Sequence, residues 1–217
     1  MHLRWELRGG EIAIFIAETR PRRLTTTRKE VPISDIALIL KAADFAADRH
    51  RKQRRKGRKK RPYIGHCTEV AWLIAEVGKV DDANVLAAAI LHDTLEDTKT
   101  EPEEIVEAFG PAIHDLVIQV TDDKRLDKDE RKKLQVEHAP HLSPGAKVIK
   151  LADKISNVRE IGEDPPKGWD IVRRQKYFGW AREVVDAMGR VNPALEKRFD
   201  ETLEESCRLL AEEAAED

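Results

Sequence analysis

Helical spacing of apolar residues dominates the chain from residue 34 onward. In DIALILKAADFAADRH, the apolar residues Ile36, Leu40 and Ala43 recur at three- and four-residue intervals, which is typical of an amphipathic helix. Ser34 precedes this stretch as a candidate N-cap, and Ser143-Pro144 is a similar start signal further on. Further helices are expected at residues 66–77, 83–94, 101–109, 111–121, 129–138, 144–160, 170–189 and 193–214. The pattern predicts an all-α domain.

The first 33 residues follow a different pattern. HLRWELRGGEIAIFIAETR alternates polar and apolar positions on both sides of Gly9-Gly10, which is typical of a β-hairpin. The stretch TTTRKEVP then reads as a linker. We therefore expect an N-terminal extension at residues 1–33, made of a hairpin and a linker, and one helical domain at residues 34–217.

Composition narrows the class of protein. Hydrophobic residues make up 41% and charged residues 37% of the 217 residues, and no apolar run approaches the roughly 20 residues of a membrane helix. Cys67 and Cys207 lie far apart and form no CxxC unit, which argues against a disulfide framework or a zinc knuckle. No secretory signal is evident. We expect a soluble, cytoplasmic protein without a membrane partner.

One segment departs from the nearly balanced charge of the chain. Nine of the eleven residues in RKQRRKGRKKR, residues 51–61, are Lys or Arg, whereas the formal net charge of the whole chain is only −2. Three interpretations are open: a nucleic-acid arm, a localisation signal, or one wall of a pocket for a small polyanion. Because the positive charge is local, a dedicated nucleic-acid-binding domain is the less favoured interpretation.

Titratable residues gather at the end of one apolar helix, in AAAILHDTLEDT. His92 and Glu96 are four residues apart, as are Asp93 and Asp97, so that each pair shares a helix face. Burial of such groups is costly unless something compensates them. A divalent metal would do so; a capped helix end with solvated acids is the alternative.

Two further segments favour a shared site. KVIKLADKISNVRE places Asp153 and Asn157 four residues apart on one face, and PYIGHCTEVAWLIAEV places His66 at the start of an otherwise apolar helix. Acids and histidines at the ends of three apolar helices indicate one common site.

The order of His66, His92-Asp93 and Asp153 resembles the H…HD…D arrangement of the HD-domain metal-dependent phosphohydrolases. The motifs YIGH, LHDTLEDT, VTDDK, SPGAKVIKLADKISNVR and QKYFGWA are similar to those of the small alarmone hydrolases, the Mesh1-like relatives of the hydrolase half of RelA/SpoT proteins. The resemblance covers about residues 38–205. It implies an HD-domain helical bundle that hydrolyses the 3′-pyrophosphate of (p)ppGpp to leave GDP or GTP, without synthesis of (p)ppGpp.

The resemblance also implies roles for individual residues. The implied metal ligands, with Mn²⁺ as the expected cofactor, are His66, His92, Asp93 and Asp153. The residues implied to position and activate the attacking water are Glu96 and Asp97, with Asn157 alongside. The residues implied to contact the nucleotide are Arg55, Lys56, Lys128, Arg173 and Tyr177. The basic tract thereby becomes part of a substrate pocket.

The sequence departs from the family pattern in the basic tract, where Gly57 to Arg61 add charge beyond the usual contacts. Two other functions are weighed against (p)ppGpp hydrolysis. One is a phosphatase for another phosphate ester, such as the 2′-phosphate of NADPH. The other is a nucleic-acid-binding module whose metal site is structural. The pattern carries no signal for the oligomeric state.

Overall fold

Capping side chains define where the helices start. The computed structural model describes residues 2–8, 11–17 and 34–216, and the chain divides between residues 32 and 33 into two units that are described separately. Ser34 accepts a hydrogen bond from the Ala37 amide and starts α1 (Asp35–Arg49). Ser143 accepts one from the Ala146 amide and starts α8 (Pro144–Glu163). Both expected start signals are confirmed.

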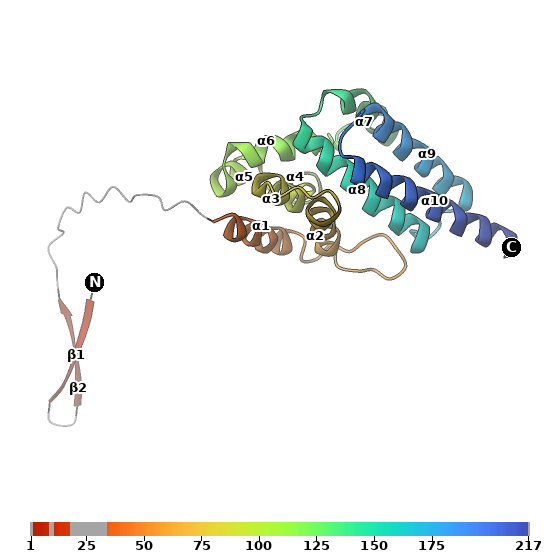
Figure 1. Ribbon diagram of the computed structural model, residues 1–217. Coiled ribbons are helices and arrows are strands. Elements are labelled where there is room, and N and C mark those ends of the chain that lie inside the picture. Colours follow the sequence, from red (N-terminus) through yellow and green to blue (C-terminus); the bar gives the residue numbers. More distant parts are fainter. Residues whose placement is uncertain (1, 9–10, 18–33, 217) are drawn as a thin grey trace. The chain divides into compact units, whose positions relative to one another are not determined.

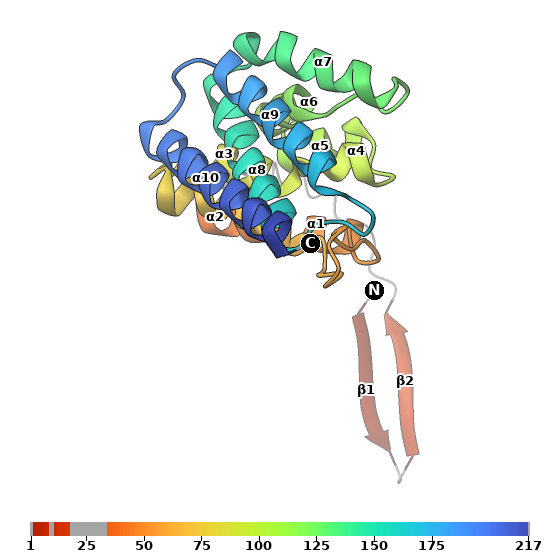
Figure 2. The ribbon, with the colours of Figure 1, turned by 90° about the vertical axis from the view of Figure 1, so that its right-hand side faces the viewer.

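Residues 34–216 form a bundle of helices (Figures 1 and 2). Besides α1 and α8, its elements are α2 (Ile64–Trp72), η1 (Leu73–Val77), α3 (Ala83–Leu91), α4 (Thr94–Asp97), α5 (Pro102–Phe109), α6 (Pro111–Val120), α7 (Lys128–His138), η2 (Ala139–His141), α9 (Ile171–Ala187) and α10 (Pro193–Glu216). The all-α class expected for this part of the chain is confirmed. The domain limits at residues 1–33 and 34–217 stay a prediction.

The helix expected over residues 83–94 is wrong in one respect. Helix α3 ends at Leu91, and a separate turn, α4, follows Asp93. The hydroxyl of Thr94 donates a hydrogen bond to the Leu91 carbonyl at 2.6 Å, so that a side chain replaces a backbone donor at the break. His92 and Glu96 therefore do not lie on one continuous helix face.

The core forms around α3 and α8, which lie side by side near the centre of the bundle (Figure 2). Eight of the nine residues of α3 are buried, so this helix is apolar on all sides, as a central helix must be. Helix α8 buries apolar residues such as Leu151 and Ile155 and packs against α2, α6, α9 and α10. Side chains carried by these two helices are therefore held on a rigid base.

The N-terminal unit contains β1 (His2–Arg8) and β2 (Glu11–Ala17), which pair antiparallel from His2 opposite Ala17 to Arg8 opposite Glu11. The expected turn at Gly9-Gly10 lies outside the described residues, and the hairpin as a whole stays a prediction. Across the described ranges, none of the helices combines the length and the apolar character needed to cross a bilayer.

Candidate active site

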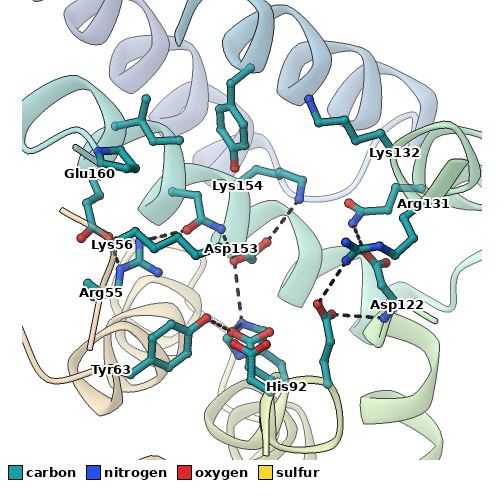
Figure 3. Close-up of a pocket in the computed structure, with 18 of the residues that line it drawn as sticks. Arg55, Lys56, Tyr63, His92, Asp122, Arg131, Lys132, Asp153, Lys154 and Glu160 are labelled. Carbon is teal, nitrogen blue, oxygen red and sulfur yellow. Dashed lines mark hydrogen bonds and ion pairs between the residues drawn. The ribbon is translucent and has the colours of Figure 1, made fainter. Parts of the chain in front are cut away.

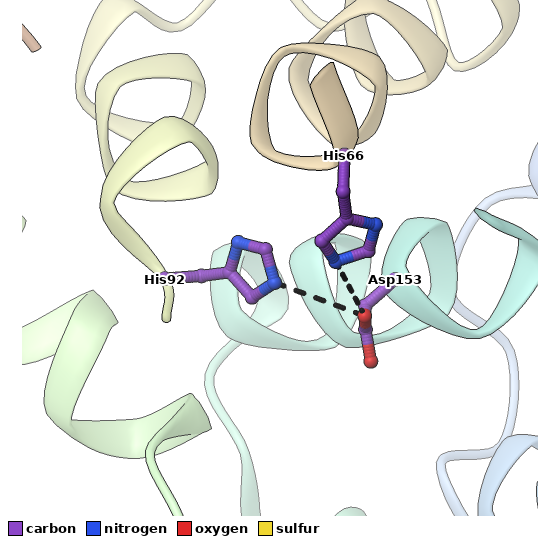
Figure 4. Close-up of side chains that lie close together, drawn as sticks. All are labelled: His66, His92 and Asp153. Carbon is purple, nitrogen blue, oxygen red and sulfur yellow. Dashed lines mark ion pairs between the residues drawn. The ribbon is translucent and has the colours of Figure 1, made fainter. Parts of the chain in front are cut away.

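Four side chains from three parts of the chain converge at the end of α3. His66 comes from α2, His92 follows α3, and Asp153 comes from α8 (Figure 4). Asp93 comes directly after His92 and precedes α4. One oxygen of Asp153, Oδ1, lies 3.3 Å from His66 Nε2 and 3.7 Å from His92 Nε2. Asp93 Oδ2 lies 3.6 Å and 3.0 Å from the same two nitrogens. The structure thus brings together the four residues expected as metal ligands.

The second ring nitrogen of each histidine is fixed by a hydrogen bond. His92 Nδ1 donates to the Ala89 carbonyl at 2.8 Å. His66 Nδ1 lies 2.8 Å from the Ser156 hydroxyl, which itself donates to Glu69 Oε2 at 3.0 Å. Because Ser156 uses its proton on Glu69, it accepts from His66. Both rings therefore turn Nε2 toward the two carboxylates, as histidine metal ligands do.

The Nε2 atoms of His66 and His92 are buried, and among the residues described they face only the carboxylates of Asp93 and Asp153, without a hydrogen bond of regular geometry. Buried polar atoms without partners are rare and call for an explanation. His66, His92 and Asp153 each offer one ligand atom, and these atoms lie within 4.8 Å of one another. Two imidazole nitrogens and two carboxylates fit a divalent transition-metal ion.

Tyr63 is a site residue that sequence reasoning did not assign. Its hydroxyl donates a hydrogen bond to Asp93 Oδ2 at 2.6 Å, and burial together with the charge of Asp93 raises the pKa of Tyr63 above its ordinary value. The phenol therefore stays protonated and keeps Asp93 oriented. Tyr63 belongs to the YIGH motif, so the motif was recognised in the sequence but no role was predicted for its tyrosine.

Glu96 and Asp97 project from α4 beside this cluster, but their surroundings differ. Asp97 accepts from Gln53 at 2.7 Å and from Lys124, so both of its oxygens are engaged. Glu96 accepts the Asp122 amide at 3.2 Å and lies 3.8 Å from Arg131. Burial, followed by the charges of Asp93 and Asp122, raises the pKa of Glu96 to about 7. Glu96 can therefore exchange a proton near neutral pH.

Asn157 connects the His66, His92, Asp93 and Asp153 cluster, the candidate metal site, to the basic tract. Its amide donates to Asp153 Oδ1 at 2.6 Å, and its carbonyl accepts from Arg55 at 2.9 Å. The Arg55 guanidinium also pairs with Glu160, and the two side chains are only 12% and 11% exposed. Arg55 thus enters the site already neutralised by a carboxylate that sequence reasoning missed. Asn157 is hydrogen-bonded to Asp153 and Arg55 rather than to Glu96 or Asp97.

The basic tract folds back on itself as a narrow ribbon. The Arg55 amide donates to the Arg61 carbonyl at 2.9 Å, and the Tyr63 amide donates to the Gln53 carbonyl at 3.2 Å. The buried carboxylate of Asp164, at the end of α8, accepts the amides of Arg58 at 2.9 Å and Lys59 at 3.2 Å. The ribbon is thereby fastened to α8.

Close packing against Asp164 predicts a sensitive position at Gly57. A Cβ atom there would lie 2.6 Å from the Asp164 backbone oxygen and would also clash with Oδ2. Gly57→Ala should displace the ribbon and destabilise the fold by about 1–3 kcal/mol. We expect a lower midpoint of thermal unfolding and a raised KM for the nucleotide. Gly179→Ala, at an exposed helical site with open space, is the matched control. Equal behaviour of the two variants would contradict the close packing of Gly57 against Asp164.

A cavity of about 680 Å³ opens beside the metal cluster (Figure 3). The side chains that line it include ten Lys or Arg and six Asp or Glu, so the cavity carries an excess of positive charge outside the metal cluster. All five residues expected to contact a nucleotide line it, namely Arg55, Lys56, Lys128, Arg173 and Tyr177. Among the basic-tract residues, Arg58 to Arg61 are exposed and do not line the cavity.

Aromatic rings form one wall of the cavity. The Arg173 guanidinium lies 4.4 Å and the Lys128 ammonium 5.5 Å from the centre of the Trp169 ring. The ring centres of Tyr177 and Trp169 lie 5.9 Å apart. Burial raises the pKa of Tyr177, so its hydroxyl remains a hydrogen-bond donor. A wall of rings and cations can hold both a base and its phosphates.

Known proteins are similar to this chain in sequence and in fold. A family model described as HD domain matches residues 42–177. The chain is 52% identical over 167 residues to guanosine-3′,5′-bis(diphosphate) 3′-pyrophosphohydrolase MESH1 of Xenopus tropicalis. The aligned region covers 77% of this chain and 93% of that protein. The chain is 50% identical over 164 residues to the protein of that name from Homo sapiens, with 76% and 92% covered.

A solved structure is similar as well. It is described as a metazoan ortholog of SpoT that hydrolyzes ppGpp, and it superposes with a TM-score of 0.76 at 42% identity. The match covers 80% of this chain and 97% of that one.

Proposed function

The chain belongs to the HD domain family, and from that premise we propose that it hydrolyses the 3′-pyrophosphate of ppGpp to give GDP and pyrophosphate. One observation carries the assignment to this site: the His66, His92, Asp93 and Asp153 cluster opens directly into a cavity lined with cations. Hydrolysis of a guanosine nucleotide with four phosphates would use both features, a metal ion to polarise a phosphoryl oxygen and cations to hold the phosphates. We extend the proposal to pppGpp, which would yield GTP.

The metal cluster is proposed to hold Mn²⁺ through His66, His92, Asp93 and Asp153. A mixed set of imidazole and carboxylate ligands, with no thiolate, suits this ion. When bound, such an ion lowers the pKa of water and polarises a phosphoryl oxygen.

Glu96 and Asp97 are proposed to have different roles in the reaction. Glu96 accepts the proton of the attacking water, because its raised pKa of about 7 matches a general base that works near neutral pH. Asp97, held by Gln53 and Lys124, fixes the basic ribbon against α4. The water oxygen bonds to the phosphorus next to O3′ while the bond from that phosphorus to O3′ breaks. The electron pair stays on O3′, which takes a proton from solvent.

The nucleotide is proposed to lie between the ribbon and the aromatic wall. Lys56 from the ribbon and Lys128 and Arg173 from the opposite wall offer charge to the phosphates, while Tyr177 and Trp169 offer aromatic surface. Arg55, already paired with Glu160, adds a guanidinium face to the site and orients Asn157. We place the protein in the cytoplasm, where its free cysteines Cys67 and Cys207 remain reduced.

The direct test is release of GDP and pyrophosphate from ppGpp by the wild-type chain, with and without Mn²⁺. Hydrolysis that depends on the metal supports the proposal. A folded, metal-loaded protein that leaves ppGpp intact would overturn it. NADPH in a parallel assay measures the alternative phosphate ester in the same pocket.

Metal binding should release a proton. Burial lowers the pKa of His92, but the Asp93 and Asp153 carboxylates outweigh burial and raise it to about 10 in the metal-free protein. The metal must displace this proton, so Mn²⁺ affinity should rise by up to tenfold per pH unit between pH 6 and 9. Calorimetry in two buffers of different ionisation enthalpy measures the proton released. A pH-independent affinity with no proton release would contradict the protonated state of His92.

A further inference from the structure

Lys154 is a buried lysine that none of the roles above uses. It follows Asp153 on α8, is only 3% exposed, and lines the cavity. Lysine is almost never fully buried unless its charge is paired. Its position inside the bundle therefore needs a reason.

The ammonium group of Lys154 is only partly satisfied. It donates one hydrogen bond, to Asp153 Oδ2 at 3.3 Å, and it lies 4.5 Å from the centre of the Trp180 ring. An ammonium group has three donors, and no second acceptor for Lys154 occurs within residues 34–216. An anionic ligand in the cavity would complete its hydrogen bonds.

The carboxylate of Asp153 is shared between Lys154 and the histidines. Its Oδ1 atom faces His66 and His92, whereas its Oδ2 atom faces the ammonium group (Figures 3 and 4). The positive charge thus lies next to the metal cluster. A cation bound by Asp153 withdraws negative charge from this carboxylate, so Lys154 then needs another counter-charge.

Trp180 keeps the ammonium group in this place. Its indole N–H donates to the Lys132 carbonyl at 3.0 Å, which fixes the ring against α7, and the ring also lies 4.8 Å from the Lys132 ammonium. A ring held in this way offers Lys154 a polarizable surface that cannot neutralise it as a carboxylate would.

We infer that Lys154 is a further catalytic residue, whose ammonium group binds the non-bridging oxygens of the 3′-pyrophosphoryl group as that group passes to water. The inference rests on the proposed function and deepens it. Negative charge shifts within this group as its bond to O3′ breaks, and a fixed cation beside the metal cluster stabilises it without reorganisation. Trp180 acts as the positioning residue of Lys154.

Lys154→Met tests this assignment, because methionine keeps the length of the side chain and removes the charge. With Mn²⁺-loaded full-length protein, kcat for ppGpp should fall by about 10²-fold. The affinity for inorganic pyrophosphate, measured by calorimetry, should fall by at least about tenfold, since it loses a charge-assisted hydrogen bond. Lys154→Arg, which keeps the charge, should retain pyrophosphate binding and guards against a fold that fails with methionine.

The matched control is Lys147→Met on the same helix. The Lys147 amine donates to the Met188 carbonyl at 2.8 Å and does not line the cavity, so neither quantity should change. Mn²⁺ affinity separates binding from support of Asp153: it stays or rises in Lys154→Met if Lys154 binds phosphate. Unchanged pyrophosphate affinity in a folded Lys154→Met, or lost Mn²⁺ affinity as its only defect, would overturn the inference. Because pyrophosphate binding needs no turnover, this result is independent of whether ppGpp is the substrate.

Discussion

Replacing His92 with alanine is expected to abolish both metal binding and hydrolysis of ppGpp. The substitution removes one of two nitrogen ligands and leaves Asp93 and Asp153 facing one another with less positive charge between them. Loss of an outer partner of a metal ligand typically costs about 10–100-fold in activity or affinity. Loss of a ligand itself should cost more, and we expect at least about 10³-fold.

The measurement pairs metal content with turnover. Bound Mn²⁺ is determined by mass spectrometry after gel filtration, and pyrophosphate release is followed on the same sample. His114→Ala is the control, because His114 is paired with Asp115 on α6, outside the cavity. A His92→Ala protein that keeps both metal and activity would show that the cluster is not the metal site.

Glu96→Gln is expected to slow the enzyme and to stabilise the fold at the same time. Glutamine cannot accept the proton of water, so kcat should fall by about 10²–10⁴-fold while Mn²⁺ stays bound. Glu96 has a pKa of about 7 in the folded, metal-free protein and about 4.5 when unfolded. Its ionisation therefore lowers stability progressively as pH rises from about 4.5 to 7, and this penalty is fully present above pH 7.

Removing that penalty gives the second half of the prediction. Each unit of pKa difference corresponds to about 1.4 kcal/mol, so metal-free Glu96→Gln should be more stable than the wild type by at most about 3 kcal/mol at pH 8 and by little at pH 4. Urea unfolding at both pH values measures this. Glu107→Gln, at an exposed site on α5, should leave stability and activity unchanged. A destabilised Glu96→Gln at pH 8 would contradict the raised pKa.

Local signals in the sequence account for most of the helices. Apolar spacing and the hydroxyls of Ser34 and Ser143 act within one or two turns, and the structure starts α1 and α8 where they predict. The break after His92 has no such signal, because HDTLED contains neither glycine nor proline. The hydrogen bond from Thr94 to the Leu91 carbonyl lies at the break, but such a bond also occurs in continuous helices, so Thr94 gives no signal in the sequence.

Some residues of the candidate site could likewise be predicted from the sequence, and others could not. The resemblance to the HD-domain phosphohydrolases implied four metal ligands and five nucleotide contacts, and the structure gathers these residues into one place. Glu160 and Asp164 were not predicted as partners of the basic ribbon, because the residues they bind are more than 100 positions away in the sequence and no local pattern indicates such a pair. Lys154 was not predicted as a site residue for another reason. A lysine next to Asp153 on a helix is expected to lie in solvent, and only the structure shows that it is buried.

The fastening of the basic ribbon bears on how this surface can change during evolution. Arg54 pairs with Pro62 across the ribbon, and Gly57 pairs with Pro166 outside it. Asp164 holds the backbone amides of Arg58 and Lys59, and these bonds do not depend on the exposed side chains of residues 58–61. Natural selection can therefore alter the charge of this tip in steps, while the backbone of the ribbon and the catalytic pocket behind it keep their geometry.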